Sequence, residues 1–340
     1  MLIRIENAIE VKMINRDQLE DRRIALIGHT GFVGETLKRQ YTGFTGYYNS
    51  ANIMDIQGRE YDLIICAAAP ATMWMANNAP DQDRQNLLNL HTHLRGAKCQ
   101  RIVLISTIAV LDDFNGKYSE KNSRFQDGTA YGKHRRELEV NIKNSFPNSH
   151  ILRLPALFGA GLKKNFIFDI LNPAPSFLKQ VKADELLCDM KQEMKLLFES
   201  LYQYDSDTTM LKLDRQKYEQ PEVRPAVNRL FDIAGFSSSM FTNSESTFQY
   251  YNMNNLWTDI RKSVNHDLET LHICSAPLKA GIIHEYLTGK PFSNTAPAEH
   301  HEDMRTVHAE KWGKEGEYLY STQETLDALK AFYDFHQSEG

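Results

Sequence analysis

Residues 22–34, with the sequence RRIALIGHTGFVG, decide the fold of this chain. The apolar run from Ile24 to Ile27 stops at Gly28, which indicates a buried strand that enters a tight turn. Glycines recur at Gly31 and Gly34, where a helix is expected to begin. Such a turn lets backbone N–H groups and the positive end of a helix approach a pyrophosphate, and its last glycine permits close packing of helix on strand. The stretch therefore predicts a dinucleotide-binding turn.

Strands and helices alternate after this turn. Apolar runs at 61–67 and 101–106 have strand character, and a helical stretch near 81–95 separates them. A helix is expected over 129–146 and a further strand at 150–154. This alternation predicts an α/β fold built on a Rossmann-type, doubly wound parallel sheet.

The regular alternation ends after Gly161. Apolar residues then recur at helical spacing over 182–204, which predicts one long amphipathic helix. Charged and polar segments on either side indicate an insertion at about 177–230. We therefore expect a Rossmann NAD(P)-binding domain over 1–165 and a smaller C-terminal substrate lobe over 166–340, interleaved with it.

The composition is that of an ordinary soluble globular protein of 340 residues, 41% hydrophobic and 24% charged. The 39 Lys and Arg against 44 Asp and Glu give a net charge of −5, so no basic field favours nucleic acid. No run of about 18 apolar residues is present, so no membrane partner and a cytoplasmic location are expected. The 4 cysteines are scattered without metal-ligand spacing, and no metal site is expected.

Three side chains four residues apart share one face of a predicted helix: Tyr131, Arg135 and Glu139. Ser106 and Thr107 end a buried strand, at the carboxyl edge where ligands bind in such sheets. A tyrosine phenol, with an unperturbed pKa of about 10, acts as an acid or base near neutrality only where positive charge favours the phenolate. Arg135, Lys133 or a nicotinamide could supply that charge, and the Thr107 hydroxyl would bind the substrate oxygen.

In this order the motifs resemble the extended short-chain dehydrogenase/reductases, and among them the NAD-dependent epimerase/dehydratase family that modifies nucleotide sugars. The glycines match its GxxGxxG turn, residues 131–139 match YxxxKxxxE, and residues 153–159 resemble its RxxNxxG strand and turn. The sequence departs from the family pattern at two positions. The family's lysine is Arg135 here, and Ala156 stands where many members have an asparagine.

The resemblance implies a role for each matching residue. Tyr131 would remove the hydroxyl proton, Thr107 would orient that oxygen, and Arg135 would hold the ribose and lower the Tyr131 pKa. Cofactor contacts are expected from Gly28, Thr30, Gly31, Phe32, Val33, Gly34, Asn49, Ser50, Asp55, Ile56, Ala67, Ala68, Ala69, Ser106, Tyr131, Arg135, Leu154 and Pro155. Substrate contacts are expected from Trp74, Thr107, Lys163, Lys164 and Asn165. An anionic substrate needs a basic pocket, for which the candidate cations are Arg135, Arg153, Lys163 and Lys164.

The cofactor can be NAD or NADP. Residues 41–51, near the end of the expected second strand, contain neither an acid for the ribose hydroxyl nor a base for an extra phosphate. Asn49 or Ser50 could bind a ribose hydroxyl instead. NAD is slightly favoured.

Two hypotheses for the function follow. In the first, the chain is an NAD(P)-dependent nucleotide-sugar epimerase or oxidoreductase of carbohydrate biosynthesis, which transfers hydride to bound nicotinamide. A dehydratase is not expected, because Ile108 and Ala109 replace the acidic pair that dehydratases carry there. In the second, a regulatory or scaffold protein keeps the NAD(P)-binding fold without catalysis, as Arg135 and Ala156 suggest. The resemblance also implies a homodimer.

Overall fold

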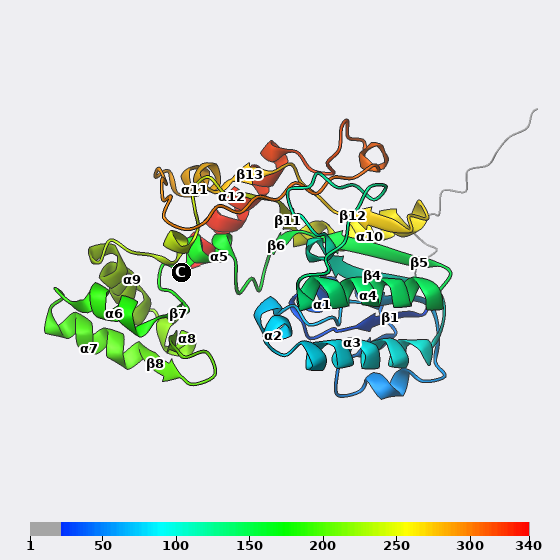
Figure 1. Cartoon of the computed structure of the whole chain (residues 1–340), viewed down its shortest axis with the longest axis horizontal. Coiled ribbons are helices and arrows are strands. Elements are labelled where there is room, and N and C mark those ends of the chain that lie inside the picture. The colour runs from blue at the N-terminus through cyan, green and yellow to red at the C-terminus, as the bar shows by residue number, and fades with distance from the viewer. Residues whose placement is uncertain (1–21, 340) are drawn as a thin grey trace, which may run out of the picture. The chain divides into compact units, whose positions relative to one another are not determined.

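The computed structural model describes residues 22–339, which form two compact units (Figure 1). The first unit contains residues 22–110, Phe125–Arg153 and Asn255–Leu271, and the second contains Leu111–Arg124, Leu154–Asn254 and residues 272–339. The chain therefore passes between the units several times. The assignment of 1–165 to cofactor and 166–340 to substrate remains a prediction.

The first unit is built on a six-stranded sheet with the strand order β12-β5-β4-β3-β1-β2. The strand pairs β1–β2, β1–β3 and β3–β4 are parallel, as the alternation of strands and helices predicts. The sheet strands are β1 Ile24–Ile27, β2 Gly46–Tyr48, β3 Glu60–Cys66, β4 Lys98–Thr107, β5 Ser149–Leu154 and β12 Thr270–His272. The helices are α1 Phe32–Gln40, α2 Met73–Asn78, α3 Pro80–Arg95, α4 Ala130–Ser145 and α10 Leu256–Asn265, with short turns η2 Ile53–Ile56 and η3 Ile108–Val110.

Both faces of this sheet are covered by helices. All four residues of β1 are buried, as expected for a strand of a doubly covered parallel sheet. On one face, Ile27, Ile64 and Leu104 of the strands pack with Leu87 of α3 and Leu138 of α4. Helices α3 and α4 lie side by side over this face (Figure 1), and α1 packs against α10. The carboxyl ends of β1, β3 and β4 consequently lie at one edge of the sheet.

The second unit contains two hydrophobic cores. The first lies within residues 174–236 and is formed by a three-stranded antiparallel sheet, in the order β7-β9-β8, together with four helices. Its elements are β7 Phe177–Leu178, α6 Gln180–Leu187, α7 Gln192–Leu201, β8 Tyr202–Asp205, β9 Met210–Leu213, α8 Arg215–Tyr218 and α9 Val223–Ile233. The insertion predicted at about 177–230 thus has a core of its own.

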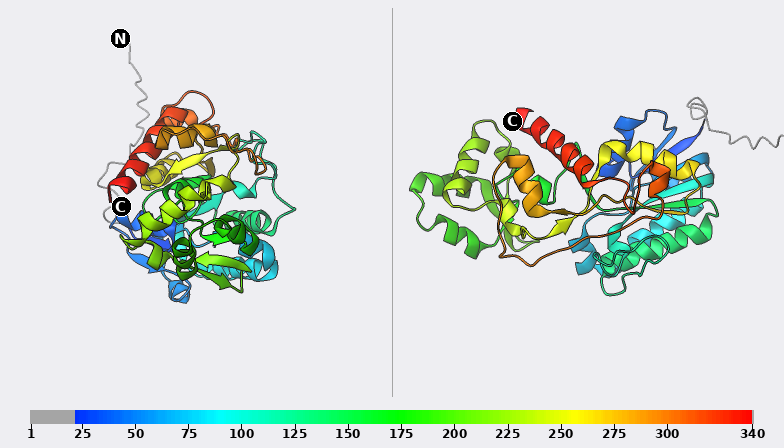
Figure 2. Two further views of the ribbon diagram at one scale, coloured as in Figure 1. Left: turned by 90° about the vertical axis from the view of Figure 1, so that its left-hand side faces the viewer. Right: turned by 90° about the horizontal axis from the view of Figure 1, so that it is seen from above.

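The second core of this unit joins α5, α11 and α12 to the parallel pair β6–β11. Helices α11 and α12 pack against each other, and both views of Figure 2 show them side by side. The remaining elements are β6 Ala156–Phe158, α5 Phe166–Leu171, η4 Ser238–Phe241, β10 Thr247–Phe248, β11 Tyr250–Asn252, η5 Met253–Asn255, β13 Leu278–Lys279, α11 Ala280–Thr288, η6 Ala309–Trp312 and α12 Thr322–Glu339.

The single helix predicted over 182–204 is wrong. Helix α6 ends at Leu187, helix α7 begins at Gln192, and residues from Tyr202 onward form strand β8. Apolar side chains of both helices, including Leu186 and Leu197, pack on the same core. No glycine or proline marks the break between the two helices in the sequence.

Candidate active site

The glycine-rich turn has the geometry that a phosphate-binding turn requires. Gly28 has φ +85, and a Cβ there would lie 2.5 Å from the Ala67 carbonyl oxygen. A Cβ on Gly34 would lie 2.1 Å from the Gly28 carbonyl oxygen, so the start of α1 packs directly on the turn. A Cβ on Gly31 meets nothing closer than 3.6 Å. Among the described residues, no side chain caps α1, and its first N–H groups are therefore available to an anion.

The segment after β3 lies against this turn. The contact between Gly28 and Ala67 brings the ends of β1 and β3 together, and the Ala67 N–H donates to the Ile27 carbonyl at 2.9 Å. Ala68 and Ala69 pack against the core cluster beneath. Ala67 and Ala68, two of the three alanines predicted to contact the cofactor, are thus adjacent to the glycine turn.

The other predicted adenosine-side residues follow β2. The Asn49 side chain accepts from the Ala51 N–H at 2.9 Å, and its amide nitrogen lies 3.4 Å from His29 Nε2. His29 Nδ1 is buried without a hydrogen-bond partner among the described residues. Ser50 and Asp55 are exposed, whereas Ile56 is buried in the sheet core.

Helix α4 begins against the turn η3 that follows β4. A Cβ on Gly132 would lie 2.1 Å from the Ala109 carbonyl oxygen, so only glycine permits this approach. Thr107 is the last residue of β4, and its hydroxyl accepts from the Ala109 N–H at 3.2 Å. Asn77 of α2 accepts from the Tyr131 N–H at 3.0 Å and caps the start of α4. Thr107 and Tyr131 are therefore brought to the same edge of the sheet.

Arg135 is fixed by a buried carboxylate on the neighbouring helix. Its guanidinium donates to Asp83 Oδ2 at 2.5 Å and to Oδ1 at 2.9 Å, and it is only 2% exposed. It also donates to the Pro70 carbonyl at 2.6 Å and to the Tyr131 carbonyl at 3.3 Å. His134 Nδ1 lies 2.9 Å from Asp83 Oδ2. Only Nε of Arg135 is buried without a hydrogen-bond partner among the described residues.

The same guanidinium stacks on the candidate base. The Arg135 Cζ lies 3.9 Å from the centre of the Tyr131 ring, which is a cation–π contact. Burial raises the pKa of the Tyr131 phenol, and the positive charge of Arg135 lowers it by a smaller amount. The Asp83 carboxylate adds a further upward shift of the pKa. The net shift is upward, which differs from the lowered pKa expected of Tyr131.

Glu139, the third residue on this helix face, is the centre of a second buried ion cluster. Arg153 donates to both of its oxygens, at 2.9 and 2.7 Å, and Arg136 donates at 2.8 Å. The Ser106 hydroxyl donates to it at 2.6 Å. Burial raises the pKa of the Glu139 carboxyl and is the largest single influence on it, but the hydrogen bonds and charges of Arg153, Ser106 and Arg136 together outweigh burial, and the net pKa is lowered. Ser106, a predicted cofactor contact, is thus engaged within the protein.

Two of the four cations expected to form a basic substrate pocket are not available in this structure. Arg135 and Arg153 are each 2% exposed, and each is neutralised by a buried carboxylate. Two positive charges at these depths require such partners, because an unpaired buried charge is strongly unfavourable. Attraction of an anionic substrate therefore has to come from other residues.

The remaining predicted residues lie as follows. Leu154 ends β5 and Pro155 follows it, both buried. Asn165 caps α5, because its side chain accepts from the Ile167 and Phe168 N–H groups. Lys163 and Lys164 are exposed just before it, in the second unit. Trp74, on α2 of the first unit, is 57% exposed.

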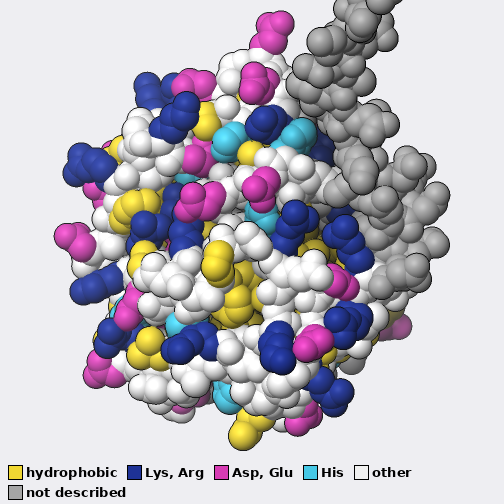
Figure 3. All heavy atoms as spheres, turned by 90° about the vertical axis from the view of Figure 1, so that its right-hand side faces the viewer, with side chains coloured by type: hydrophobic (Ala, Val, Ile, Leu, Met, Phe, Trp, Pro, Cys, Tyr) yellow, Lys and Arg dark blue, Asp and Glu magenta, His cyan; other side chains and the backbone are white. Residues whose placement is uncertain are grey.

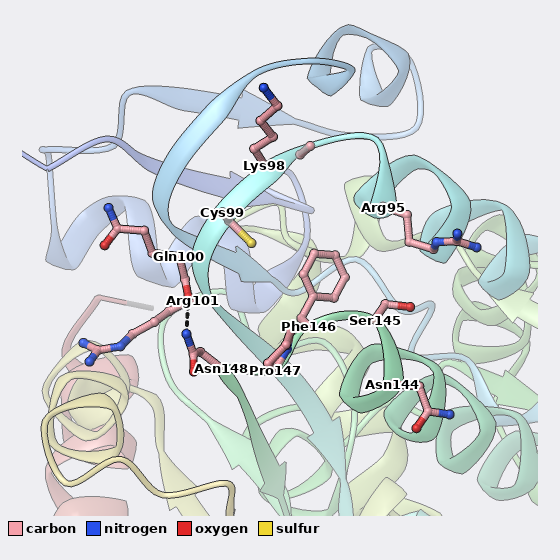
Figure 4. A pocket seen from close by; sticks show the side chains of 11 residues that line it. Arg95, Lys98, Cys99, Gln100, Arg101, Asn144, Ser145, Phe146, Pro147 and Asn148 are labelled. Carbon is pink, nitrogen blue, oxygen red and sulfur yellow. Dashed lines mark hydrogen bonds between the residues drawn. The ribbon is translucent and has the colours of Figure 1, made fainter.

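A pocket of about 460 Å³ opens at the opposite, amino-terminal edge of the sheet. Phe146 and Cys99 contribute to its lining, and three basic residues belong to it, Arg95, Lys98 and Arg101. Figure 4 shows these three side chains pointing away from one another. The face seen in Figure 3 carries Lys and Arg side chains with Asp and Glu between them. The pocket shares no residue with the predicted site.

Sequence reasoning missed Asp83, Pro70 and Asn77 as parts of this site. Asp83 lies in the first turn of a helix, where acidic residues are common because they favour the positive helix end. Nothing in the sequence separates it from Asp81 in the same turn. The departure of Arg135 from the family lysine was the one available signal, because a buried guanidinium requires an acidic partner.

No protein-family model and no curated protein matches this chain, so its known likenesses are solved structures. One is UDP-N-acetylglucosamine 4-epimerase from Methanobrevibacter ruminantium M1, in complex with UDP-N-acetylmuramic acid. It is 12% identical with a TM-score of 0.61, and the match covers 94% of this chain and 100% of that one. RMD from Pseudomonas aeruginosa, complexed with NADPH, is 13% identical with a TM-score of 0.60 over 94% and 100%.

A third is dTDP-4-dehydrorhamnose reductase from Bacillus anthracis in complex with NADP, which is 13% identical with a TM-score of 0.56. That match covers 92% of this chain and 98% of the reductase. At these identities the likeness concerns the fold. The chain therefore shares the fold of these epimerase and reductase structures, and its parallel sheet is the Rossmann-type sheet that the alternation of strands and helices predicts.

Proposed function

We propose that this chain is an NAD(P)-dependent nucleotide-sugar epimerase or oxidoreductase. The observation that supports this most is the gathering of four features at the carboxyl edge of one sheet: the turn 28–34, the segment 67–70, Thr107 and Tyr131. Ligands of doubly wound sheets bind at this edge. The pocket at the other edge has none of these groups.

The residues present fit a nicotinamide dinucleotide. The glycines leave room for a pyrophosphate at the start of α1, and His29 Nδ1 is a buried polar atom that still needs a partner. When bound, the cofactor would supply the hydride acceptor. Two of the similar structures contain NADP or NADPH, and residues 41–51 of this chain offer no base for the extra phosphate. We therefore propose NAD or NADP, with NAD slightly favoured.

Each residue of the site has one role in this proposal. Tyr131 takes the proton from a sugar hydroxyl as the carbon loses hydride, and Thr107 orients that oxygen. Arg135 supports the phenolate by stacking on the ring. The ribose contact that the resemblance implies for Arg135 would need its Nε, which is buried without a partner among the described residues, to become accessible. In an epimerase, the same hydride returns to the opposite face of the ketone.

The substrate and the assembly are also part of the proposal. Trp74, Lys163 and Lys164 are the exposed residues that we assign to the nucleotide sugar. We assign a homodimer contact to the outer surfaces of α3 and α4, which lie side by side in the first unit.

Replacement of Tyr131 with Phe tests this function. Purified protein is incubated with UDP- and dTDP-sugars and either NAD or NADPH, and turnover is followed by nicotinamide absorbance and by NMR of the sugar. We expect turnover to fall by roughly 10²- to 10⁴-fold, because positioned acid–base catalysis contributes that much. Undiminished turnover of Tyr131→Phe would contradict the assignment.

A second candidate function is a nucleotide-binding protein without catalysis. It is favoured by one observation, the commitment of Arg135 to Asp83 together with the raised pKa of Tyr131. Such a protein would retain NAD(P) through purification, yet neither reduce nor interconvert any nucleotide sugar. Mass spectrometry of small molecules released from the purified protein, combined with the turnover assay, distinguishes the two candidates.

A further inference from the structure

The charged groups around Tyr131 form a closed network that involves two helices and one loop. Arg135 lies one turn beyond Tyr131 on α4, and Asp83 approaches it from α3. His134 shares the Asp83 carboxylate. Asp83, His134 and Arg135 are each at least nine-tenths buried. Among the described residues, Asp83, His134 and Arg135 are the charged or titratable groups that contact one another in this network.

A buried arginine held in this way differs physically from the lysine that it replaces. A lysine ammonium is a single point charge on a flexible stem, whereas a guanidinium is a planar fork whose position follows its bidentate partner. Here the four N–H groups of the two terminal nitrogens have acceptors in Asp83, Pro70 and Tyr131. The cation near the phenol is therefore located by Asp83 and not by a bound ligand.

We propose that Asp83 is a positioning residue of the site, which holds Arg135 in its stacked place over Tyr131 and, by way of Arg135, anchors the segment 67–70 that lies against the glycine turn. The effect of this positioning on turnover rests on the proposed function. The positioning itself depends only on the contacts between Asp83, Arg135, Tyr131 and the Pro70 carbonyl.

The charge of Asp83 and its positioning of Arg135 shift the pKa of Tyr131 in opposite directions. The direction of the shift in a variant therefore distinguishes the two. The Asp83 carboxylate by itself raises the pKa of the phenol, and Arg135 lowers it by more. If Asp83 contributed only its charge, Asp83→Asn would lower the titration midpoint of Tyr131. If Asp83 holds Arg135 in place, the same variant releases the cation and the midpoint rises toward that of Arg135→Gln.

The experiment places 3-fluorotyrosine at position 131, because its more acidic phenol titrates at lower pH, and records the ¹⁹F NMR shift against pH. We expect the midpoint to rise on the order of one pH unit in Asp83→Asn, the shift that loss of a charge about 4 Å away produces. Arg135→Gln should raise it similarly. A fall or no change in Asp83→Asn would overturn the inference.

The chain offers a matched control in Glu137→Gln. Glu137 also lies on α4 and forms a bidentate ion pair with a residue of α3, Arg84, but this pair is on the surface and does not contact Tyr131 or Pro70. Its loss should leave the fluorotyrosine midpoint unchanged. Asp83→Glu provides a second test variant if Asp83→Asn fails to fold. It keeps the charge but displaces the carboxylate, so its midpoint should also rise, and an unchanged midpoint would count against positioning.

Hydrogen exchange of the backbone reports the second half of the inference. Exchange at the amides of residues 67–69, 71 and 72 should accelerate in Asp83→Asn and Arg135→Gln, because the hydrogen bond to the Pro70 carbonyl is lost. It should stay as in the wild type in Glu137→Gln. Equal exchange in all variants would overturn the anchoring role. Neither readout needs cofactor or substrate, so the inference stands or falls separately from the Tyr131→Phe turnover assay.

Discussion

Replacement of Glu139 with Gln should destabilise the first unit severely. The substitution keeps the size of the side chain but removes the negative charge that pairs with Arg153 and Arg136 and that accepts a hydrogen bond from the Ser106 hydroxyl. Glu139 is fully buried and Arg153 is 2% exposed, so the guanidinium left behind has no access to water. Breaking a buried pair by removing one partner costs about 3–5 kcal/mol. That is a large part of a total stability of about 5–15 kcal/mol.

Hydrogen exchange of peptides from β4 and α4 measures this loss, because both elements belong to the first unit and the two units need not unfold together. Glu137→Gln is the control, since it breaks an exposed ion pair on the same helix. We expect the exchange free energy to fall strongly in Glu139→Gln and hardly at all in the control. A loss in Glu139→Gln of less than about 1 kcal/mol, the size typical of surface pairs, would refute the reasoning.

Three further predictions concern the turn, the pH dependence and the second unit. Gly34→Ala should abolish NAD(P)H binding measured by calorimetry, because its Cβ would lie 2.1 Å from the Gly28 carbonyl oxygen; binding within twofold of the wild type would contradict this. Stability should be lost on acidification, since the folded-state pKa of Asp83 and of Glu139 lies below the usual values of 3.8 and 4.5. Each contributes stability that is present above its unfolded pKa and disappears as pH falls through its folded pKa. A thermal midpoint that stays constant between neutral pH and about pH 3 would argue against this. Leu230→Ala in α9 should cost about 2–5 kcal/mol in urea unfolding, because Leu230 is 1% exposed in the core of the insertion; an unchanged midpoint would show that this core adds little.

Local chemistry explains how much of the fold could be predicted from the sequence. The run Ile24 to Ile27 is typical of a strand buried on both faces, as in a parallel sheet covered by helices, and Gly28 is the residue that reaches φ +85 at its end. Residues that follow one another in the sequence meet both of these requirements. The glycine turn, the strand ending at Thr107 and the helix carrying Tyr131 were therefore predictable. The break between α6 and α7 was not predictable, because no glycine or proline marks it in the sequence and the apolar spacing continues across it.

The partners of the charged side chains were decided by the tertiary structure alone. The spacing of Tyr131 and Arg135 predicts that they share a helix face, and they do stack. That Arg135 faces Asp83, fifty-two residues earlier in the chain, depends on how α3 packs beside α4. A cation near a phenol lowers its pKa, whereas burial and a carboxylate raise it, and the balance depends on distances that spacing does not contain. The sequence by itself thus determined the glycine turn, the end of the strand at Thr107 and the helix face that Tyr131 shares with Arg135. The packing of the helices decided the rest, because it brought Asp83 to Arg135 and left that charge neutralised inside the protein.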